Sequence, residues 1–247
     1  MISIITPTIR PKGLEIVAKS LSWQTLTDYE WLVGSSFKPE HDCVWVKDDF
    51  KGGFWTLNRI YNKLISKAKG NLLVSWQDFT YADPEALSKF LFYYRKDRRT
   101  IATGVGGKYE DDSWTNRVWQ DPRERDDLGS MYETDFANIE GNFCGVPKRA
   151  MYDIGGFDEE LDQLGFGMDW YGVLERLYDF GGYRFMIDQT NKSYSLEHGR
   201  VGGKKWDKHN LLDGGYQRRR TELIKADVYP VLGYLQENGK IKKRLKP

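Results

Sequence analysis

Three side chains in this sequence have the type and position needed for chemistry on a phosphate-bearing ligand: Asp78, Asp169 and His198. Asp78 comes just after an apolar run, Leu72 to Val74, which predicts a buried strand. Ligands of open α/β sheets bind beyond the carboxyl ends of the strands, and a carboxylate placed there can hold a metal ion on a phosphate. Alone, Asp78 is a weak signal, because carboxylates are common at strand ends.

Asp169 and His198 are also ambiguous when each is taken alone. Asp169 precedes an apolar helical pattern, and a helix start favours a carboxylate whatever its function. His198 ends an expected extended segment, 193–198, and precedes Gly199. A single histidine is more often structural than a ligand, so only the order of the three residues along the chain strengthens the case.

The first half of the chain alternates strand and helix patterns. We expect strands at 2–6, 29–33, 43–46, 72–76 and 101–105, and helices at 14–21, 57–68 and 84–94. Asp83 and Pro84 predict the start of the last helix, as its N-cap and first helical residue. This alternation favours a mainly parallel sheet with right-handed crossovers.

The second half is less regular. Residues 106–137 show weak periodicity and many charges, which is typical of a functional or mobile loop. Trp114 and Trp119 in this region are either core residues or ligand-stacking groups. We expect strands at 142–146 and 183–187, a short helix at 147–154, a turn at 155–160, a helix from Asp169 to Gly181, and helical segments near 211–212 and 221–231.

Composition narrows the class of protein. The 247 residues are 40% hydrophobic and 30% charged, which indicates a globular chain and not a disordered one. A net charge of +1 gives no argument for a nucleic-acid partner. Cys43 and Cys144 lack metal or redox spacing and suit a reducing compartment. There is no signal-peptide pattern and no apolar run near the roughly 20 residues of a membrane span, so we expect a cytoplasmic protein.

Taken in order, the motifs resemble those of the family-two inverting glycosyltransferases of the GT-A fold, over roughly residues 1–200 of this chain. Segments 2–8, 20–25 and 29–33 are similar to the nucleotide-binding start of that family, and Thr56-Leu57-Asn58 is similar to its Asn-bearing helix. Gly155-Gly156-Phe157-Asp158-Glu159 resembles its most specific signature. Segments 167–170 and 174–177 stand where the family carries an acidic pair and an Arg-Leu helix.

The resemblance implies an α/β fold with a Rossmann-like, mainly parallel sheet flanked by helices. It divides a glycosyltransferase domain, 1–200, into a nucleotide-binding half, 1–105, and an acceptor half, 106–200, followed by a helical C-terminal extension, 201–247. It also implies an enzyme of hexosyltransferase type. Such an enzyme moves a sugar from a nucleotide-diphosphate donor, usually a UDP-sugar, to an acceptor hydroxyl with inversion.

In that family an Asp-x-Asp motif holds a divalent metal ion on the diphosphate. Asp78 occupies this site, but Trp76 and Gln77 stand where the partner carboxylate is expected. His198 is the implied second ligand. One carboxylate and one imidazole bind Mn²⁺ or Mg²⁺ less tightly than two carboxylates, and Mn²⁺ tolerates imidazole better.

The resemblance makes Asp169 the general base that accepts the proton of the acceptor hydroxyl. A positioned base contributes typically about 10²- to 10⁴-fold to the rate. The acid that precedes this base in the family is Met168 here. Gly141 and Asn142 are expected on the acceptor side. Arg200, Lys204 and Lys205 are expected to cover the diphosphate as a loop with glycine hinges.

The residues expected to contact the donor are Pro7, Thr8, Arg10, Ser35, Asn58, Trp76, Gln77 and Asp78. Ser35 stands where the family often has an aspartate that recognises uracil, which leaves the nucleotide open. Asp48 or Asp49 is the alternative for that role. Trp76 is expected to stack near the sugar.

Two other functions compete with an active transferase. A sugar-nucleotide- or glycan-binding module that has lost turnover would explain the incomplete Asp-x-Asp and Met168. A nucleotidyltransferase is disfavoured, because the loop from Pro7 to Pro11 lacks the glycines of its phosphate loop. The acceptor stays open among polysaccharide, lipid-linked glycan, protein and modified nucleic acid.

Overall fold

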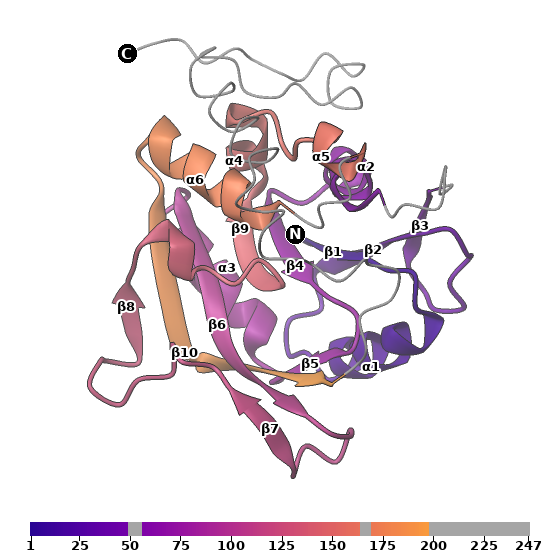
Figure 1. Ribbon diagram of the computed structural model, residues 1–247, viewed down its shortest axis with the longest axis horizontal. Helices are drawn as coiled ribbons and strands as arrows, with labels where there is room; N and C mark the ends of the chain where they lie inside the picture. The colour runs from indigo at the N-terminus through magenta and orange to yellow at the C-terminus, as the bar shows by residue number, and fades with distance from the viewer. Residues whose placement is uncertain (49–55, 164–168, 198–247) are drawn as a thin grey trace.

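The structure is a computed structural model that describes residues 1–48, 56–163 and 169–197 (Figure 1). The strands of these residues are β1 (Ile2–Pro7), β2 (Tyr29–Ser35), β3 (Val44–Lys47), β4 (Leu72–Trp76), β5 (Thr80–Ala82), β6 (Thr100–Tyr109), β7 (Arg117–Gln120), β8 (Met131–Glu133), β9 (Phe143–Pro147) and β10 (Arg184–Leu196). The helices are α1 (Pro11–Ser22), α2 (Leu57–Lys67), α3 (Ala86–Lys96), α4 (Lys148–Asp153), α5 (Glu160–Gln163) and α6 (Trp170–Phe180), with a 3-10 turn at Phe136–Asn138.

The strands form one sheet with the main order β3-β2-β1-β4-β9-β6-β10-β5, while β7 pairs with β6 and β8 with β10. β1 is parallel to both of its neighbours, β2 and β4. β9 runs antiparallel to β4 and β6, so the sheet is mixed. The predicted α/β class is confirmed. β6 crosses the expected boundary between the two halves at residue 105.

The chain leaves β1 through α1 to reach β2 on one side, and it later returns through α2 to β4 on the other side. The carboxyl ends of β1 and β4 therefore frame a topological switch point, the place where open α/β sheets bind ligands. Figure 1 shows these two strand ends side by side.

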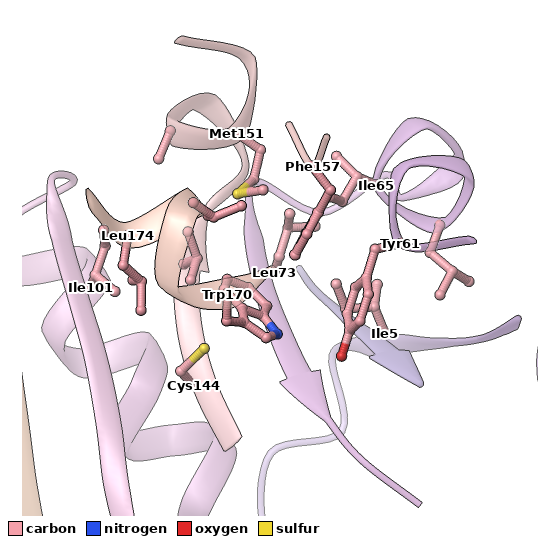
Figure 2. Packing of buried hydrophobic residues seen from close by; sticks show 14 of the residues in the cluster. Ile5, Tyr61, Ile65, Leu73, Ile101, Cys144, Met151, Phe157, Trp170 and Leu174 are labelled. Carbon is pink, nitrogen blue, oxygen red and sulfur yellow. The ribbon is translucent and has the colours of Figure 1, made fainter. Parts of the chain in front are cut away.

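Helices cover both faces of the sheet. Alternation along the strands sends neighbouring side chains to opposite faces; Ile4 and Ile5 join two different apolar clusters in this way. One cluster packs beneath α1 and α3. The other packs beneath α2, α4 and α6, and Figure 2 shows part of it.

Several boundaries differ from the sequence predictions for local reasons. α3 begins at Ala86, because Asp83 and Pro84 form a turn in which the carbonyl of Asp83 accepts from the Ala86 amide. The two segments expected at 183–187 and 193–198 form the single strand β10, interrupted by an irregularity between Asp188 and Lys192. The region 106–137, expected to be irregular, contains β7 and β8.

Within the described ranges, no helix combines the length and the apolar character needed to cross a bilayer. The helical segments expected near 211–212 and 221–231 lie outside the described residues, as does His198.

The cluster of Figure 2 contains three packed rings. They belong to Tyr61 of α2, to Phe157 of the glycine-rich segment 155–159, and to Trp170 of α6. The Tyr61 and Phe157 rings are stacked, with their centroids 4.7 Å apart. The Trp170 ring makes edge contacts with both, at centroid distances of 5.7 Å to Tyr61 and 5.0 Å to Phe157. Phe157 belongs to the glycine-rich signature segment and is fully buried. The signature therefore joins α2 to the start of α6 through aromatic packing.

Replacing Phe157 by alanine should lower the free energy of unfolding by about 3–5 kcal/mol, because a large buried ring leaves a cavity. Urea unfolding followed by circular dichroism measures this change. Phe92, which is 58% exposed on α3, is the matched control, and Phe92→Ala should stay within about 0.5 kcal/mol of the wild type. Equal effects of the two substitutions would contradict the packing described.

Candidate functional site

A partly buried ion pair joins the loops that follow β1 and β4 at the switch point. Arg10, in the loop after β1, donates from Nε to Asp78 Oδ2 at 2.9 Å and from Nη2 to Asp78 Oδ1 at 2.6 Å. The Thr8 hydroxyl donates to Asp78 Oδ2 at 2.5 Å. Asp78 is only 3% exposed. Charge-assisted fork geometry of this kind is strong and directional, so the pair fixes both loops.

The loop after β4 packs closely on the start of α1. Phe79 has a left-handed backbone, with φ of +59°, and its amide donates to the Gly13 carbonyl. A Cβ on Gly13 would lie 2.7 Å from the Phe79 ring and 2.8 Å from Asp78 Cβ. A glycine is needed for this approach. The Arg10 guanidinium lies over the Phe79 ring at 5.1 Å.

Of the other residues predicted to contact the donor, Pro7 and Thr8 lie at the switch point with Arg10, and both are buried. Gln77 follows β4, and its amide donates to the Asn142 carbonyl at 3.1 Å. Ser35 lies at the end of β2 and is buried, with its hydroxyl donating to the Phe37 carbonyl. These positions agree with a ligand site beyond the strand ends.

The side chains of Trp76 and Asp48 are buried and contact other protein groups, so both have a structural role. Trp76 is fully buried, its Nε1 donates to the Thr80 carbonyl, and its ring meets the edge of Phe143 at 5.0 Å. The structure therefore corrects the expectation that this ring stacks on a sugar, because no face of it is open. Asp48 is buried and pairs with Arg59 and Lys63 of α2, while its alternative, Asp49, lies outside the described residues.

Asp169, the predicted base, is the N-cap of α6. Its Oδ1 accepts from the Gly172 amide at 3.0 Å, and Arg176 Nη2 lies 3.8 Å from Oδ2. Its own amide donates to Asn58 Oδ1 at 2.9 Å. Asn58 is fully buried, so in this structure Asn58 positions the start of α6, where the sequence predicted a donor contact.

α2 also binds the segment that leads to Asp169. Asp162 accepts hydrogen bonds from the amides of Asn58 and Arg59, and so caps the start of α2 from a distance of about 100 residues along the chain. Asn62 exchanges hydrogen bonds with the backbone of Phe157. Sequence reasoning missed this network. Its signal is two asparagines, four residues apart, inside an apolar helical stripe.

A cavity of about 650 Å³ opens beside Asp78. Glycines of β6, polar side chains and the apolar side chains of Trp119, Phe143 and Leu196 line it. The glycines and polar residues are Gln77, Asp78, Thr80, Gly104, Gly106, Gly107, Lys108, Asp121, Arg123, Glu140, Asn142, Ser193, Ser195 and Glu197. Trp119, 44% exposed, belongs to this wall, whereas Trp114 packs among tyrosines. The buried Asn142 Oδ1 has no hydrogen-bond donor among the described residues.

The carboxylate of Asp78 is used differently from the predicted metal ligand. Both of its oxygens accept from Arg10, and one also accepts from Thr8. The described part of the chain contains no cluster of three or more His, Cys, Asp or Glu side chains that could hold a metal ion. The predicted partner His198 and the covering loop with Arg200, Lys204 and Lys205 lie outside it. The donor set of the described residues does not fit a divalent cation.

Neither a protein-family model nor a curated protein sequence matches the chain. Solved structures do match it. A crystal structure of GalNAc-T7 with UDP, GalNAc and Mn²⁺ has a TM-score of 0.63 and 13% identity, and the match covers 98% of this chain. Two structures of S. aureus TarS have TM-scores of 0.55 and 0.58 at 14% and 13% identity, and each match covers 79% of this chain.

The chain has a GT-A-like fold, with a central open sheet flanked by helices. At these identities the likeness concerns the fold alone. The matches span 55% of the GalNAc-T7 chain, and 60% and 36% of the two TarS chains.

Burial raises the pKa of Asp162 to about 6, against hydrogen bonds from Arg59 and Asn58 that lower it. The folded state then holds this proton more tightly than the unfolded state does, so the contribution of Asp162 to the free energy of unfolding should fall as pH rises from about 4 to about 6.

The difference in unfolding free energy between wild type and Asp162→Ala, measured by urea titration at several pH values, should shrink over that window. Asp126→Ala, at an exposed position, is the control for the loss of a carboxylate. A constant wild-type to Asp162→Ala difference would show that Asp162 is not the titrating group.

Proposed function

We propose that this protein transfers a sugar from a nucleotide-diphosphate donor, a UDP-sugar, to an acceptor hydroxyl with inversion at the anomeric carbon. The observation that carries the proposal is the cavity beside Asp78, which lies just beyond the carboxyl end of β4 in a GT-A-like sheet and is otherwise lined mainly by residues of β6, β9 and β10. Thr8 and Arg10, in the loop after β1, donate hydrogen bonds to the carboxylate of Asp78, so the nucleotide would lie over the ends of β1 and β4.

The donor class rests on the fold and on the polarity of the site. The solved GalNAc-T7 structure of similar fold contains UDP together with GalNAc and Mn²⁺. In the present chain the cavity wall combines glycines with hydrogen-bonding side chains and one partly exposed indole, Trp119. Such a surface suits a sugar ring, which offers hydroxyl groups at its edge and an apolar face.

The acceptor would enter from the side of Glu140 and Asn142, because these residues line the cavity and lie near the start of α6. Gly141, between them, packs so closely on Trp170 that a Cβ there would lie 2.0 Å from the indole. This contact holds the segment from Glu140 to Asn142 against Trp170, the residue next to Asp169. A glycan hydroxyl is our first choice of acceptor.

In the proposed reaction the acceptor oxygen forms a bond to C1 of the sugar as the bond from C1 to the diphosphate oxygen breaks. The diphosphate leaves with the electron pair, and the acceptor proton passes to the carboxylate of Asp169. The hydrogen bonds of Asp169 to Gly172 and Asn58 fix its orientation. We include no metal ion in this scheme, because the described residues do not fit one.

A binding module without turnover is the second candidate, and one observation favours it. Asp169 is almost fully buried and acts as a helix cap, which is a sufficient structural reason for an aspartate at this position. A test of turnover must therefore separate the capping of α6 from proton transfer.

Asp169→Asn makes this separation, because asparagine caps a helix about as well as aspartate but cannot accept the proton. Transfer from a UDP-sugar to a glycan acceptor should fall by about 10²- to 10⁴-fold, while UDP binding by calorimetry should stay within about twofold. Asp179→Asn, on the exposed part of α6, is the matched control and should retain full activity. Undiminished transfer by Asp169→Asn would eliminate the base assignment.

The stereochemistry gives an independent test. Single displacement assisted by Asp169 inverts C1, so proton NMR of the first product should show the anomer opposite to that of the donor. A product that keeps the donor configuration would rule out this mechanism while leaving the transferase activity itself intact.

A further inference from the structure

The Arg10–Asp78 pair occupies the place that the resemblance assigns to a divalent cation. We propose that Arg10 itself binds the donor diphosphate there, so that nucleotide binding does not require a metal ion. This inference rests on the proposed function, since it concerns how the same site holds its donor.

Both carboxylate oxygens of Asp78 are already bound by Arg10. They accept two N–H groups of the guanidinium and the Thr8 hydroxyl. A metal ion on Asp78 would have to displace this fork and leave a guanidinium, 19% exposed, without its partner. The partner carboxylate position of an Asp-x-Asp is occupied by Trp76, whose ring is fully buried in the core.

Arg10 retains N–H donors that a ligand can use. A guanidinium has five N–H groups, and the two that donate to Asp78 leave three without a partner among the described residues. Asp78 binds the edge of the Arg10 guanidinium that carries Nε. The Phe79 ring lies against one face of the guanidinium, with its centroid 5.1 Å from Arg10 Cζ. A guanidinium fixed on one edge and one face presents its remaining edge, which matches the geometry of phosphate oxygens.

The charges around Arg10 also favour an anion. Arg10 and Asp78 cancel each other, but Arg10 is also the N-cap of α1, a 12-residue helix with no acidic side chain in its first turn and no side-chain cap. The positive end of the helix dipole therefore adds to the three free N–H groups. The two together provide a site for an anion beside the cavity that reaches Asp78.

The test is calorimetric binding of UDP to the full 247-residue chain, once in EDTA and once in Mn²⁺. The Kd values in the two buffers should agree within about threefold. Arg10→Ala should weaken UDP binding at least tenfold in both buffers. Arg10→Lys should also weaken it, because an ammonium cannot form the fork with Asp78. Arg149→Ala removes an exposed arginine paired with Asp153 and should bind UDP as the wild type does.

Arg10→Ala leaves Asp78 buried without its partner, which can prevent folding. The double variant Arg10→Met/Asp78→Asn removes both charges and keeps the volume, and circular dichroism verifies its fold. It should lose UDP binding as Arg10→Ala does. Binding equal to the wild type in either folded variant would overturn the proposal.

The binding results distinguish a failure of the role proposed for Arg10 from a failure of the proposed transferase function. UDP binding that falls tenfold or more in EDTA and returns with Mn²⁺ would overturn the role of Arg10 and leave the transferase proposal standing. If neither UDP, GDP, CDP nor dTDP binds in either buffer, both the nucleotide-sugar function and the inference fail.

Discussion

The Arg10–Asp78 ion pair is the interaction on which the rest of the site depends. It joins the loops that follow two neighbouring parallel strands, β1 and β4, where the direction of chain winding reverses. A partly buried pair of this kind adds little net stability, because desolvation offsets the attraction. Its effect is geometric: it holds the loops after β1 and β4 in one arrangement beside the cavity. Gly13 permits this arrangement by letting α1 contact Asp78 and Phe79 directly.

A second set of contacts positions Asp169 independently of that pair. Asn58 and Asn62 of α2 bind the backbone near Asp169 and the signature phenylalanine, and Tyr61 lies between Ser75 of β4 and the ring of Trp170. α2 therefore contacts both β4, the strand that ends near Asp78, and the start of α6, the helix capped by Asp169. The glycine-rich signature resembles a motif of an enzyme family, but its observed contacts in this chain are those of a structural clamp.

The sequence predicted most elements that are set by local chemistry. The apolar run before Asp78, the stripe of α2 and the capping position of Asp169 each follow from spacing and residue type, and the structure has them in place. Long-range pairing was not predictable in this way. Nothing in the spacing of Arg10 and Asp78, 68 residues apart, shows that they pair, and nothing local shows that Trp76 points into the core.

The most direct test of the role of Arg10 is a crystal of the protein soaked with UDP and Mn²⁺, with data collected at the manganese absorption edge. We expect the diphosphate against the guanidinium of Arg10, at the ends of β1 and β4, with the Arg10–Asp78 fork intact and no anomalous peak on Asp78. Anomalous density on Asp78 with Arg10 displaced would contradict the role given to Arg10. A nucleotide bound elsewhere, with the switch point empty, would contradict the site itself.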